Sequence, residues 1–384
     1  MRILVLNGGS SSLKATLRVV QSADTSPTAP VWEAHVDWGR EPGKAEMRIG
    51  AKTQTLSIQS PAEVLAPVLA TVPGPVDVVG HRVVHGGVAF RDTTRITPDV
   101  KEAIRKYCEF APEHNRLELE AIEAAEAAFN GVPQIAVFDT AFHATIPEAA
   151  RVYPGPWDWV EQGIRRYGFH GISHQYVSRR AARMTSCRRI VSCHLGSGAS
   201  LAAIRDGASV DTTMGFTPLE GLMMGTRSGS VDPGILIYLV RHKGYDAAGL
   251  DRILNKESGL KGISGISGDM REVLAAMARG EARAQLAFDI YVHRLCREIG
   301  GMVASLGGFD ALVFTAGIGE NCPPLRAAVC ERLSFWGIRL DGAKNTRTPV
   351  DAVISADDSA VRVLVVHTDE DWQIARECQK LEVG

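Results

Sequence analysis

Short apolar runs alternate with longer amphipathic segments along the whole chain. Each apolar run ends in glycine or in a few small polar residues, as buried strands commonly do. The predicted strands are Arg2–Asn7, Val76–Gly80, Gln134–Asp139, Arg189–His194, Ala311–Ala316 and Arg362–His367. Helical spacing predicts helices over Pro98–Phe110, Leu117–Phe129, Met270–Arg279 and Ala282–Leu306. Strands that alternate with amphipathic helices indicate an α/β protein with largely buried sheets.

One short pattern occurs twice in the sequence. Leu4–Ser12 and Val191–Ser200 each run from a predicted strand into glycine and small hydroxyl residues. Two such turns, nearly half a chain apart, suggest a duplicated structural unit with a nucleotide held between the copies. No low-complexity linker divides the chain.

Length and charge narrow the class of protein. A chain of 384 residues is long enough for about two domains. Its 42 basic and 44 acidic residues give a formal net charge of −2, which argues against a nucleic-acid binder or a polybasic membrane-surface protein. No apolar run approaches the roughly 20 residues of a membrane span. One of the longest, Gly234–Val240, is predicted to lie in the core.

Cysteine usage bears on the cellular compartment. The seven cysteines are scattered, form no CxxC pair and have no metal-ligand spacing. An odd, scattered set is typical of reduced thiols inside the cell. The first apolar run, Ile3–Leu6, is too short for a signal peptide. We therefore expect a cytoplasmic protein.

The two turns rich in glycine and serine are candidate phosphate sites, because successive backbone N–H groups in such a turn form a concave anion-binding surface. Neither turn has the spacing of a P-loop or of a dinucleotide-binding motif, and either alone would more often be an ordinary turn. Lys14 follows the first turn, and its ammonium group could meet a phosphate oxygen. This lysine favours the phosphate interpretation of the first turn.

Two arginines are framed by glycines. Arg82 lies in the segment HRVVHGG just beyond a predicted strand, and Arg227 lies in GTRSGS. Most arginines are solvated surface groups. An arginine held close to the backbone at a strand end can instead clamp a carboxylate or a phosphate through two parallel hydrogen bonds.

Other candidates are less clear from the residues alone. Asp139 and Glu370 follow predicted strands, where a carboxylate either caps the next helix or holds Mg²⁺. Capping is the better interpretation of Asp369, whereas the two interpretations of Glu370 are about equal. His170 lies in the turn YGFHG, and a lone histidine is usually structural.

Nine motifs, in register over essentially the whole chain, resemble those of the acetate kinase family. This family comprises the acyl-phosphate-forming kinases of the actin and sugar-kinase superfamily. Any one motif could arise by chance, whereas nine in the same order indicate family membership. The motifs are Leu6–Lys14, Gly80–Gly87, Phe138–His143, Tyr167–Gly171, His194–Ser200, Met214–Gly229, Ser258–Leu260, Ser267–Arg271 and Phe314–Asn321.

The resemblance implies two RNase H-like (actin-like ATPase) α/β domains that face each other across a nucleotide cleft. Residues 1–140 with 369–384 would form the N-terminal domain, and residues 141–368 the C-terminal domain. It also implies reversible phosphoryl transfer from ATP to acetate, giving acetyl phosphate and ADP. The reaction would depend on Mg²⁺ (Mn²⁺ could replace it), and family members are typically homodimers.

The resemblance further implies roles for individual residues. Asn7 and Glu370 would position the metal ion. The residues around the reacting atoms would be Arg82 for the acyl carboxylate, Asp139 beside the reacting groups, and His170 and Arg227 for the transferring phosphoryl group.

The remaining implied residues would enclose the acyl group and the nucleotide. The acyl group would contact Val84, Phe169 and Pro218. The nucleotide and its phosphates would be held by Lys14, His194, Leu195, Gly196, Ser197, Gly198, Asp269, Met270, Arg271, Gly317, Ile318, Gly319, Glu320 and Asn321.

The chemistry expected of this family fits the charges of these residues. A carboxylate attacks the γ-phosphorus in line, and charge spreads over three equatorial oxygens. Both substrates are anions, so Arg82, Arg227, Lys14 and Mg²⁺ would supply the fixed cations, with His170 as a further donor. Acetate is already ionised at neutral pH and needs no general base. We therefore interpret Asp139 as a carboxylate that orients an arginine or the metal.

The chain departs from the usual family motifs at three places. Ser197 stands where the family usually has asparagine, and it keeps a hydrogen-bonding oxygen. The usual Thr-Asn-Glu-Glu becomes Thr368–Asp371, which retains Glu370. Glu113 replaces a leucine that lines the pocket for the acyl methyl group.

Glu113 leaves the acyl preference open. A carboxylate in an apolar pocket that faces a carboxylate substrate would be costly. Its side chain could turn to solvent, pair with a cation such as Arg116, or serve a more polar acid. An ordinary short-chain acid is favoured, and the alternatives are a propionate, butyrate or polar-acid kinase of the same family.

A protein of another class is the remote alternative. An ATP-binding regulatory or chaperone-like module of the same superfamily would share the nucleotide residues. Such a module would have no use for a second anion site formed by Arg82, Asp139, His170 and Arg227. The sequence therefore favours the enzyme.

Overall fold

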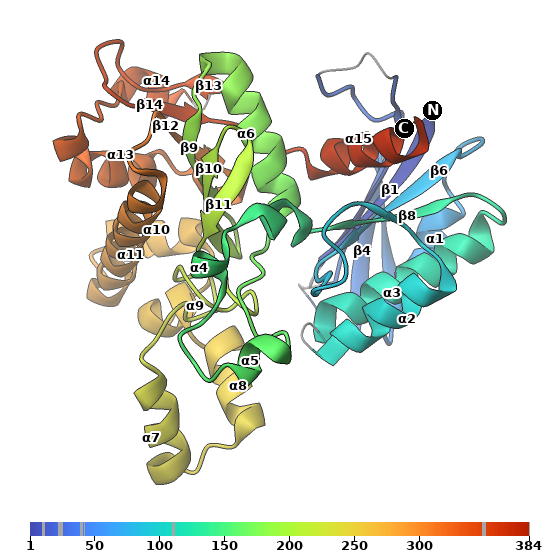
Figure 1. Cartoon of the computed structure of the whole chain (residues 1–384), viewed down its shortest axis with the longest axis horizontal. Coiled ribbons are helices and arrows are strands. Elements are labelled where there is room, and N and C mark those ends of the chain that lie inside the picture. Colours follow the sequence, from blue (N-terminus) through green and yellow to red (C-terminus); the bar gives the residue numbers. More distant parts are fainter. Residues whose placement is uncertain are drawn as a thin grey trace. The chain divides into compact units, whose positions relative to one another are not determined.

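Two mixed β-sheets carry the fold, and each forms the centre of one compact unit (Figure 1). The computed structural model describes residues 1–9, 12–21, 26–38, 41, 43–109, 112–347 and 351–383, without the side chains of residues 109 and 112–114. Unit 1 comprises Met1–Phe142, Gly171–Ser173 and Asp369–Gly384, and unit 2 comprises His143–His170 and His174–Thr368.

Within the described residues, the sheet of unit 1 has eight strands in the order β5-β4-β3-β2-β1-β6-β8-β7. β1, β6 and β8 are parallel, and the other neighbouring strands are antiparallel. The strands are β1 (Arg2–Gly8), β2 (Ser12–Val19), β3 (Trp32–Asp37), β4 (Lys44–Ile49), β5 (Lys52–Ser57), β6 (Val78–Val83), β7 (Thr94–Arg95) and β8 (Gln134–Phe138). The helices are α1 (Leu65–Leu69), α2 (Pro98–Lys106), α3 (Pro112–Ala128) and α15 (Glu370–Val383), with 3-10 turns at Pro61–Val64 and Tyr107–Glu109.

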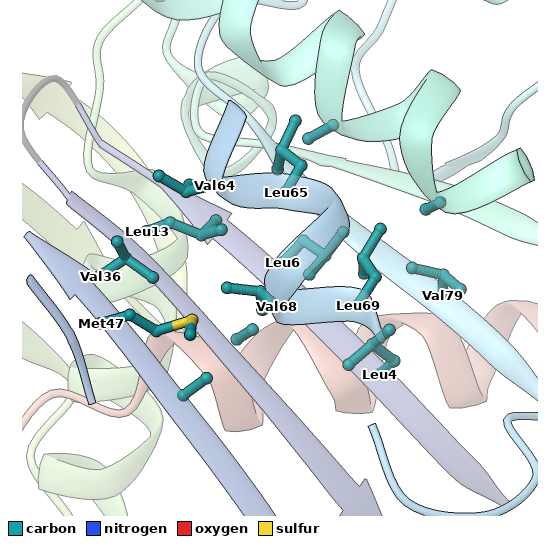
Figure 2. Close-up of a cluster of buried hydrophobic side chains, with 14 of the residues drawn as sticks. Leu4, Leu6, Leu13, Val36, Met47, Val64, Leu65, Val68, Leu69 and Val79 are labelled. Atoms are coloured by element: carbon teal, nitrogen blue, oxygen red, sulfur yellow. The ribbon is translucent and has the colours of Figure 1, made fainter. Parts of the chain in front are cut away.

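Alternating side chains of the sheet in unit 1 pack against helices on both faces. Leu4 and Leu6 of β1 are buried in a cluster with Leu65 and Val68 of α1, as Figure 2 shows. α15 packs against the opposite face of β1, β6 and β8 (Figure 1). A Cβ on Gly80 of β6 would lie 2.6 Å from the Cys378 Sγ of α15, so only glycine allows this close approach. Burial on both faces explains why the sequences of the central strands are continuous apolar runs.

In the described part of unit 2, six strands form a sheet in the order β11-β10-β9-β12-β14-β13. They are β9 (Arg189–Leu195), β10 (Ala199–Arg205), β11 (Ala208–Thr212), β12 (Ala311–Thr315), β13 (Ala352–Val353) and β14 (Arg362–Val365). The helices are α4 (Glu148–Arg151), α5 (Asp158–Glu161), α6 (Gly171–Thr185), α7 (Pro233–Lys243), α8 (Ala247–Lys256), α9 (Gly259–Ser264), α10 (Met270–Ala278), α11 (Ala282–Leu306), α12 (Ala316–Asn321), α13 (Pro323–Arg332) and α14 (Gly342–Thr346), with 3-10 turns at Ala141–Thr145 and Ser334–Trp336.

The two sheets share one strand plan. Five strands of unit 1, in the order β3-β2-β1-β6-β8, correspond to β11-β10-β9-β12-β14 of unit 2. In each set the second strand is antiparallel to both of its neighbours, and the last three strands are parallel. The two strand-to-glycine segments noticed in the sequence are β1 and β9, which occupy equivalent central places. The predicted duplication is therefore confirmed at the level of topology.

The predicted strands and helices are present, with two shifts that affect the site. β6 extends to Val83, so Arg82 lies inside this strand rather than beyond it. The prediction ended the strand at Gly80 because polar residues follow, but the ladder between β6 and β8 continues through His81 and Arg82. α3 begins at Pro112, five residues before the predicted start at Leu117.

α7 contradicts the prediction that Gly234–Val240 lies in the core. None of its residues is buried, and Ile235, Ile237, Tyr238 and Val240 are each about half exposed. An apolar run in a sequence predicts that its side chains are covered, but it does not show which surface covers them. Across the described ranges, no helix combines the length and the apolar character needed to cross a membrane.

Candidate active site

The junction of β1 and α15 gathers polar side chains in unit 1. The Asn7 amide at the end of β1 donates to Glu370 Oε2 at 3.2 Å and to Asp371 Oδ1 at 3.0 Å. Asp369 accepts from the Trp372 backbone N–H at 3.0 Å and so caps α15, as predicted. The structure therefore brings together the two residues predicted to position the metal ion. Asp369, in contrast, caps the helix.

Lys14 stands beside Asn7 because the two residues are direct partners in the β1–β2 ladder. Its ammonium lies 3.0 Å from Asp371 Oδ2, and its side chain remains 40% exposed. Burial opposes the charge of Lys14, but Asp371 outweighs burial and raises the pKa of the lysine. Asp371 was not predicted as a site residue. The only sequence signal for it was its place in the acidic cluster after β14.

Arg82 and Asp139 form a buried ion pair at the ends of two parallel strands, β6 and β8. The Arg82 guanidinium donates to Asp139 Oδ2 at 2.6 and 3.1 Å and to the Gly8 carbonyl at 2.7 Å. Burial disfavours this charge, yet Asp139 and Glu370 raise the pKa of Arg82 above its ordinary value. The other carboxylate oxygen of Asp139 is buried and accepts no hydrogen bond from any described residue. The site thus holds a permanent cation beside an available carboxylate oxygen.

Glu118 of α3 is a buried carboxyl that the sequence analysis did not single out. The Val84 backbone N–H donates to its Oε2 at 3.0 Å, while its Oε1 has no hydrogen-bond partner within the described part of the chain. Burial raises the pKa of Glu118 to about 8, although Arg82 opposes the shift, so the group is protonated at neutral pH. Glu118 and Arg82 line one cavity of about 10 Å³, the space of about one water molecule. The side chain of Glu113 lies outside the described residues.

The hairpin turn between β9 and β10 is the predicted second phosphate loop of unit 2. The Gly196 N–H donates to the Gly198 carbonyl at 2.9 Å, and the Gly225 N–H donates to the Ser197 carbonyl at 3.1 Å. A Cβ on Gly198 would lie 3.4 Å from both the Arg227 guanidinium and His170 Nε2. The two predicted phosphoryl-stabilising side chains therefore converge on this turn.

The local backbone explains how His170 reaches the turn. His170 has a left-handed φ of 55° directly before α6, a conformation that a residue with a Cβ rarely adopts. A Cβ on Gly171 would lie 2.1 Å from the Asp139 carbonyl, so glycine is required there. The His170 ring stacks on His194 with 4.2 Å between centroids, and its Nδ1 lies 2.9 Å from Ser200 Oγ.

The predicted acyl residues of unit 2 border the same region. Phe169 is buried and precedes His170 in the chain. The Pro218 carbonyl accepts a hydrogen bond from the Arg227 guanidinium at 3.1 Å. Arg227 therefore links the phosphate turn to the segment that contains Pro218.

The residues predicted to enclose adenosine lie at the start of α10 and along the short helix α12. Asp269 caps α10 through the Arg271 N–H at 2.8 Å and pairs with the exposed Arg271 guanidinium at 2.5 Å. Met270 is buried, so its side chain belongs to the core of unit 2. Gly317 and Asn321 are exposed at α12, while Ile318 is half-buried and Gly319 is buried.

The carboxylate of Glu320 makes hydrogen bonds within unit 2. Its Oε1 accepts from the Ala316 N–H at 2.8 Å and from the Thr368 N–H at 3.2 Å. Its Oε2 lies 2.7 Å from His367 Nδ1. Ala316, at the start of α12, has a left-handed φ of 63°. Glu320 thus holds the strained turn between β12 and α12.

The fold and the site define an α/β phosphotransferase: two sheets of one plan, a fixed cation beside carboxylates, and a glycine turn that faces histidine and arginine. Solved structures agree. An acetate kinase from Porphyromonas gingivalis has a TM-score of 0.89 and 38% identity over 99% of both chains. A propionate kinase from Francisella tularensis subsp. tularensis SCHU S4 has a TM-score of 0.89 and 36% identity over 98% of both chains. The predicted fold class is confirmed.

Sequence comparisons identify the family. An acetate kinase of Nostoc punctiforme is 56% identical over 99% of both chains, and one of Gloeobacter violaceus is 55% identical over 98% of both. The profile of the acetokinase family matches residues 2–376. The chain belongs to this family, whose members are phosphotransferases with a carboxyl group as acceptor and ATP as co-substrate.

We expect Glu118→Gln to change how stability depends on pH. A carboxyl group whose pKa is raised on folding contributes stability that is present at low pH. This stability is lost as the pH rises from the pKa of the group in the unfolded chain, 4.5, to its pKa in the folded protein, about 8. The free energy of unfolding of the wild type should therefore fall relative to that of the variant between about pH 5 and pH 8, and level off above. Urea unfolding at five pH values measures this. The half-exposed Glu123→Gln on the same helix is the matched control, and parallel curves for wild type and Glu118→Gln would contradict the prediction.

Proposed function

We propose that the protein is an acetate kinase that catalyses reversible, Mg²⁺-dependent phosphoryl transfer between ATP and acetate. The observation that carries the proposal is the Arg82 guanidinium, a permanent cation only 13% exposed that is held beside the carboxylates that would position a metal ion. Acetate and triphosphate repel each other, so a reaction between them needs such fixed positive charge. Family members named acetate kinase at more than 50% identity support the choice of acetate.

In this proposal, Arg82 binds and orients the substrate carboxylate. Its ion pair with Asp139 fixes the plane of the guanidinium, which limits the directions from which a carboxylate can bind. Val84 and, from unit 2, Phe169 and Pro218 would contact the acyl group. Orientation matters because in-line attack on phosphorus requires the attacking oxygen to point along one axis.

The transferring phosphoryl group would be stabilised from unit 2. His170 Nε2 and the Arg227 guanidinium stand close to Gly198, where the absence of a side chain leaves space. Both can donate hydrogen bonds to equatorial oxygens as negative charge develops on them. Lys14 would contact a phosphate as well, and its exposed ammonium is accessible for this.

The nucleotide would be held by the phosphate turn His194, Leu195, Gly196, Ser197 and Gly198, and by the residues at the start of α10 and along α12. The exposed Gly317 and Asn321 favour contact with a ligand. Met270 and Glu320, whose side chains are engaged within the protein, would contribute through backbone atoms.

A magnesium site fits the residues at the β1–α15 junction. Asp139 Oδ1 is buried without a partner among the described residues, and Glu370 and Asn7 add further oxygen donors of the type that Mg²⁺ prefers. Mg²⁺ usually keeps several waters and binds few protein ligands. Among the described residues, no three His, Cys, Asp or Glu side chains are grouped so that they could hold a metal ion. When bound, the ion would neutralise charge on the phosphates.

Three broader features belong to the same proposal. The two compact units would be the N-terminal and C-terminal domains. All seven cysteines are free thiols, which favours a cytoplasmic protein. A homodimer would explain α7, because a helix that is apolar on all sides and unburied needs a covering surface, and a two-fold pairing lets each copy cover the other.

The substrate is tested by acyl phosphate formation with Mg-ATP, trapped as the hydroxamate, for acetate, propionate, butyrate and glycolate. We expect acetate to have the highest kcat/KM. A preference for propionate or butyrate would name another kinase of the same family. A preference for glycolate would indicate that Glu113 contacts the substrate, and no acyl phosphate from any acid despite ATP binding would favour a regulatory ATP-binding module.

Asp139→Asn should lower kcat by about 100-fold, because the guanidinium of Arg82 loses the charge that orients it. The shape of the pH–rate profile should stay that of the wild type, since acetate needs no base. Asp310→Asn, which removes the carboxylate partner of Arg189 in unit 2, controls for the loss of an ion pair. Loss of the acidic limb of the profile in Asp139→Asn would instead identify Asp139 as a general base.

Charges on α7 should separate the proposed dimer. The double variant Ile235→Lys/Val240→Lys places two ammonium groups in the proposed interface, where burial without partners is costly. Sedimentation equilibrium should show two chains for the wild type and one for the variant. Leu286→Lys, an equally exposed apolar position on α11, is the control and should leave the mass unchanged. A wild type that sediments as one chain would remove the dimer from the proposal.

A further inference from the structure

A continuous line of hydrogen-bonding side chains runs from the core of unit 2 to His170. Ser192 Oγ of β9 lies 2.9 Å from His174 Nδ1, and His174 Nε2 lies 2.8 Å from Ser200 Oγ of β10. Ser200 Oγ in turn lies 2.9 Å from His170 Nδ1. Ser192, His174 and Ser200 have no solvent exposure. The two contacts that His174 makes with Ser192 and Ser200 therefore lack competition from water.

The geometry points to His174 and Ser200 as positioning residues that fix the tautomer of His170. We propose that they keep the hydrogen of the neutral His170 ring on Nε2, the nitrogen that stands at the Gly198 turn. This inference rests on the proposed role of His170 as a donor to the transferring phosphoryl group.

If the hydrogen bonds all run from Ser192 towards His170, every N–H and O–H group that links these four side chains has an acceptor. The Ser192 hydroxyl donates to His174 Nδ1, and His174 Nε2–H donates to Ser200 Oγ. The Ser200 hydroxyl then donates to His170 Nδ1, which leaves the hydrogen of His170 on Nε2. Burial holds the pKa of His174 well below its ordinary value, so this ring stays neutral and has one N–H to give. The line can thus act as a fixed chain of donors.

The tautomer matters because the two ring nitrogens have opposite hydrogen-bonding character. A neutral imidazole with its hydrogen on Nδ1 would present the lone pair of Nε2 to a phosphoryl oxygen and repel it. A hydrogen on Nε2 makes the same ring a donor. The left-handed backbone of His170 supports a constrained orientation, since such a conformation persists only where the surroundings hold it.

A second histidine–serine contact in unit 2 offers a matched control. His143 Nδ1 lies 2.9 Å from Ser209 Oγ, and both residues are buried. His143 Nε2 donates to the Phe169 carbonyl at 3.1 Å, so the tautomer of His143 is fixed by the backbone. Ser209→Ala removes a hydroxyl of the same kind from outside the line of Ser192, His174 and Ser200, although the His143 ring packs edge-on against the His174 ring with 5.8 Å between centroids.

Ser200→Ala should lower kcat by about 10- to 100-fold, the usual effect of removing a group that orients a functional histidine. The KM values for ATP and acetate should change by less than about 3-fold, because His170 acts on the charge that develops during transfer. Ser209→Ala should retain the wild-type kcat. Equal losses in the two variants would show a general packing effect and overturn the inference, as would a wild-type kcat in Ser200→Ala.

Two substitutions of His174 test whether its hydrogen bond to Ser200 matters, because one of them keeps a donor and the other does not. In His174→Gln the side-chain amide can still donate to Ser200, whereas in His174→Ala nothing replaces the donor. We expect the glutamine variant to retain at least 10-fold more activity than the alanine variant at matched stability. Equal activity of the two variants would mean that donation to Ser200 has no role.

Nitrogen NMR of ring-labelled histidine reads the tautomer without any turnover. The wild type at neutral pH should show His170, assigned with a His170→Gln variant, with Nε2 protonated and Nδ1 bare. Ser200→Ala should show a mixture of tautomers. A wild-type ring protonated on Nδ1 overturns the inference even if the enzyme is active. A correct tautomer in a protein that forms no acyl phosphate would instead refute the proposed function alone.

Discussion

The buried ion pair of Arg82 and Asp139 is the interaction on which the arrangement of unit 1 depends. A guanidinium cannot lose its proton, so a buried arginine requires acceptors wherever the fold places it. Asp139 and the Gly8 carbonyl supply them, and they come from the ends of β8 and β1, the strands on either side of β6. Three parallel strands therefore end around one permanent charge. A carboxylate partner for Arg82 is a condition of folding, and in the proposed function it would also orient the substrate.

The other carboxyls near Arg82 show how the charge is balanced. Glu118 is protonated at neutral pH, and burial also raises the pKa of Glu370 against the opposing effect of Arg82. Asp371 is paired with Lys14. More carboxyls therefore surround Arg82 than one guanidinium can neutralise, and among the described residues Lys14 is paired with Asp371 alone. An environment of this kind favours additional positive charge, which agrees with the proposed magnesium ion.

The sequence predicted the framework well because strand, glycine and helix signals are local. β1 and β9, their glycine turns and the duplicated plan were all predicted from two runs of nine and ten residues, Leu4–Ser12 and Val191–Ser200. The residues that the prediction missed depend on long-range contacts. Asp371 reaches Lys14 across more than 350 positions, and Glu118 becomes unusual only because α3 buries it against β6. α7 was wrongly assigned to the core for the same reason, since its own sequence does not define its neighbours.

The duplicated plan also shows how one hairpin can serve two kinds of chemistry. Asn7 and Lys14 are paired across β1 and β2, one pair away from the turn, and His194 and Ser200 are paired at the equivalent place across β9 and β10. In unit 1 this pair contacts carboxylates of α15, so it carries charge suited to a metal ion and phosphate. In unit 2 the pair meets His170 and His174, whose rings can make directed hydrogen bonds instead. The strand order fixes where the pair lies in each unit. The side chains at these positions, together with the neighbouring helix, then determine whether the unit supplies fixed charge or oriented hydrogen-bond donors.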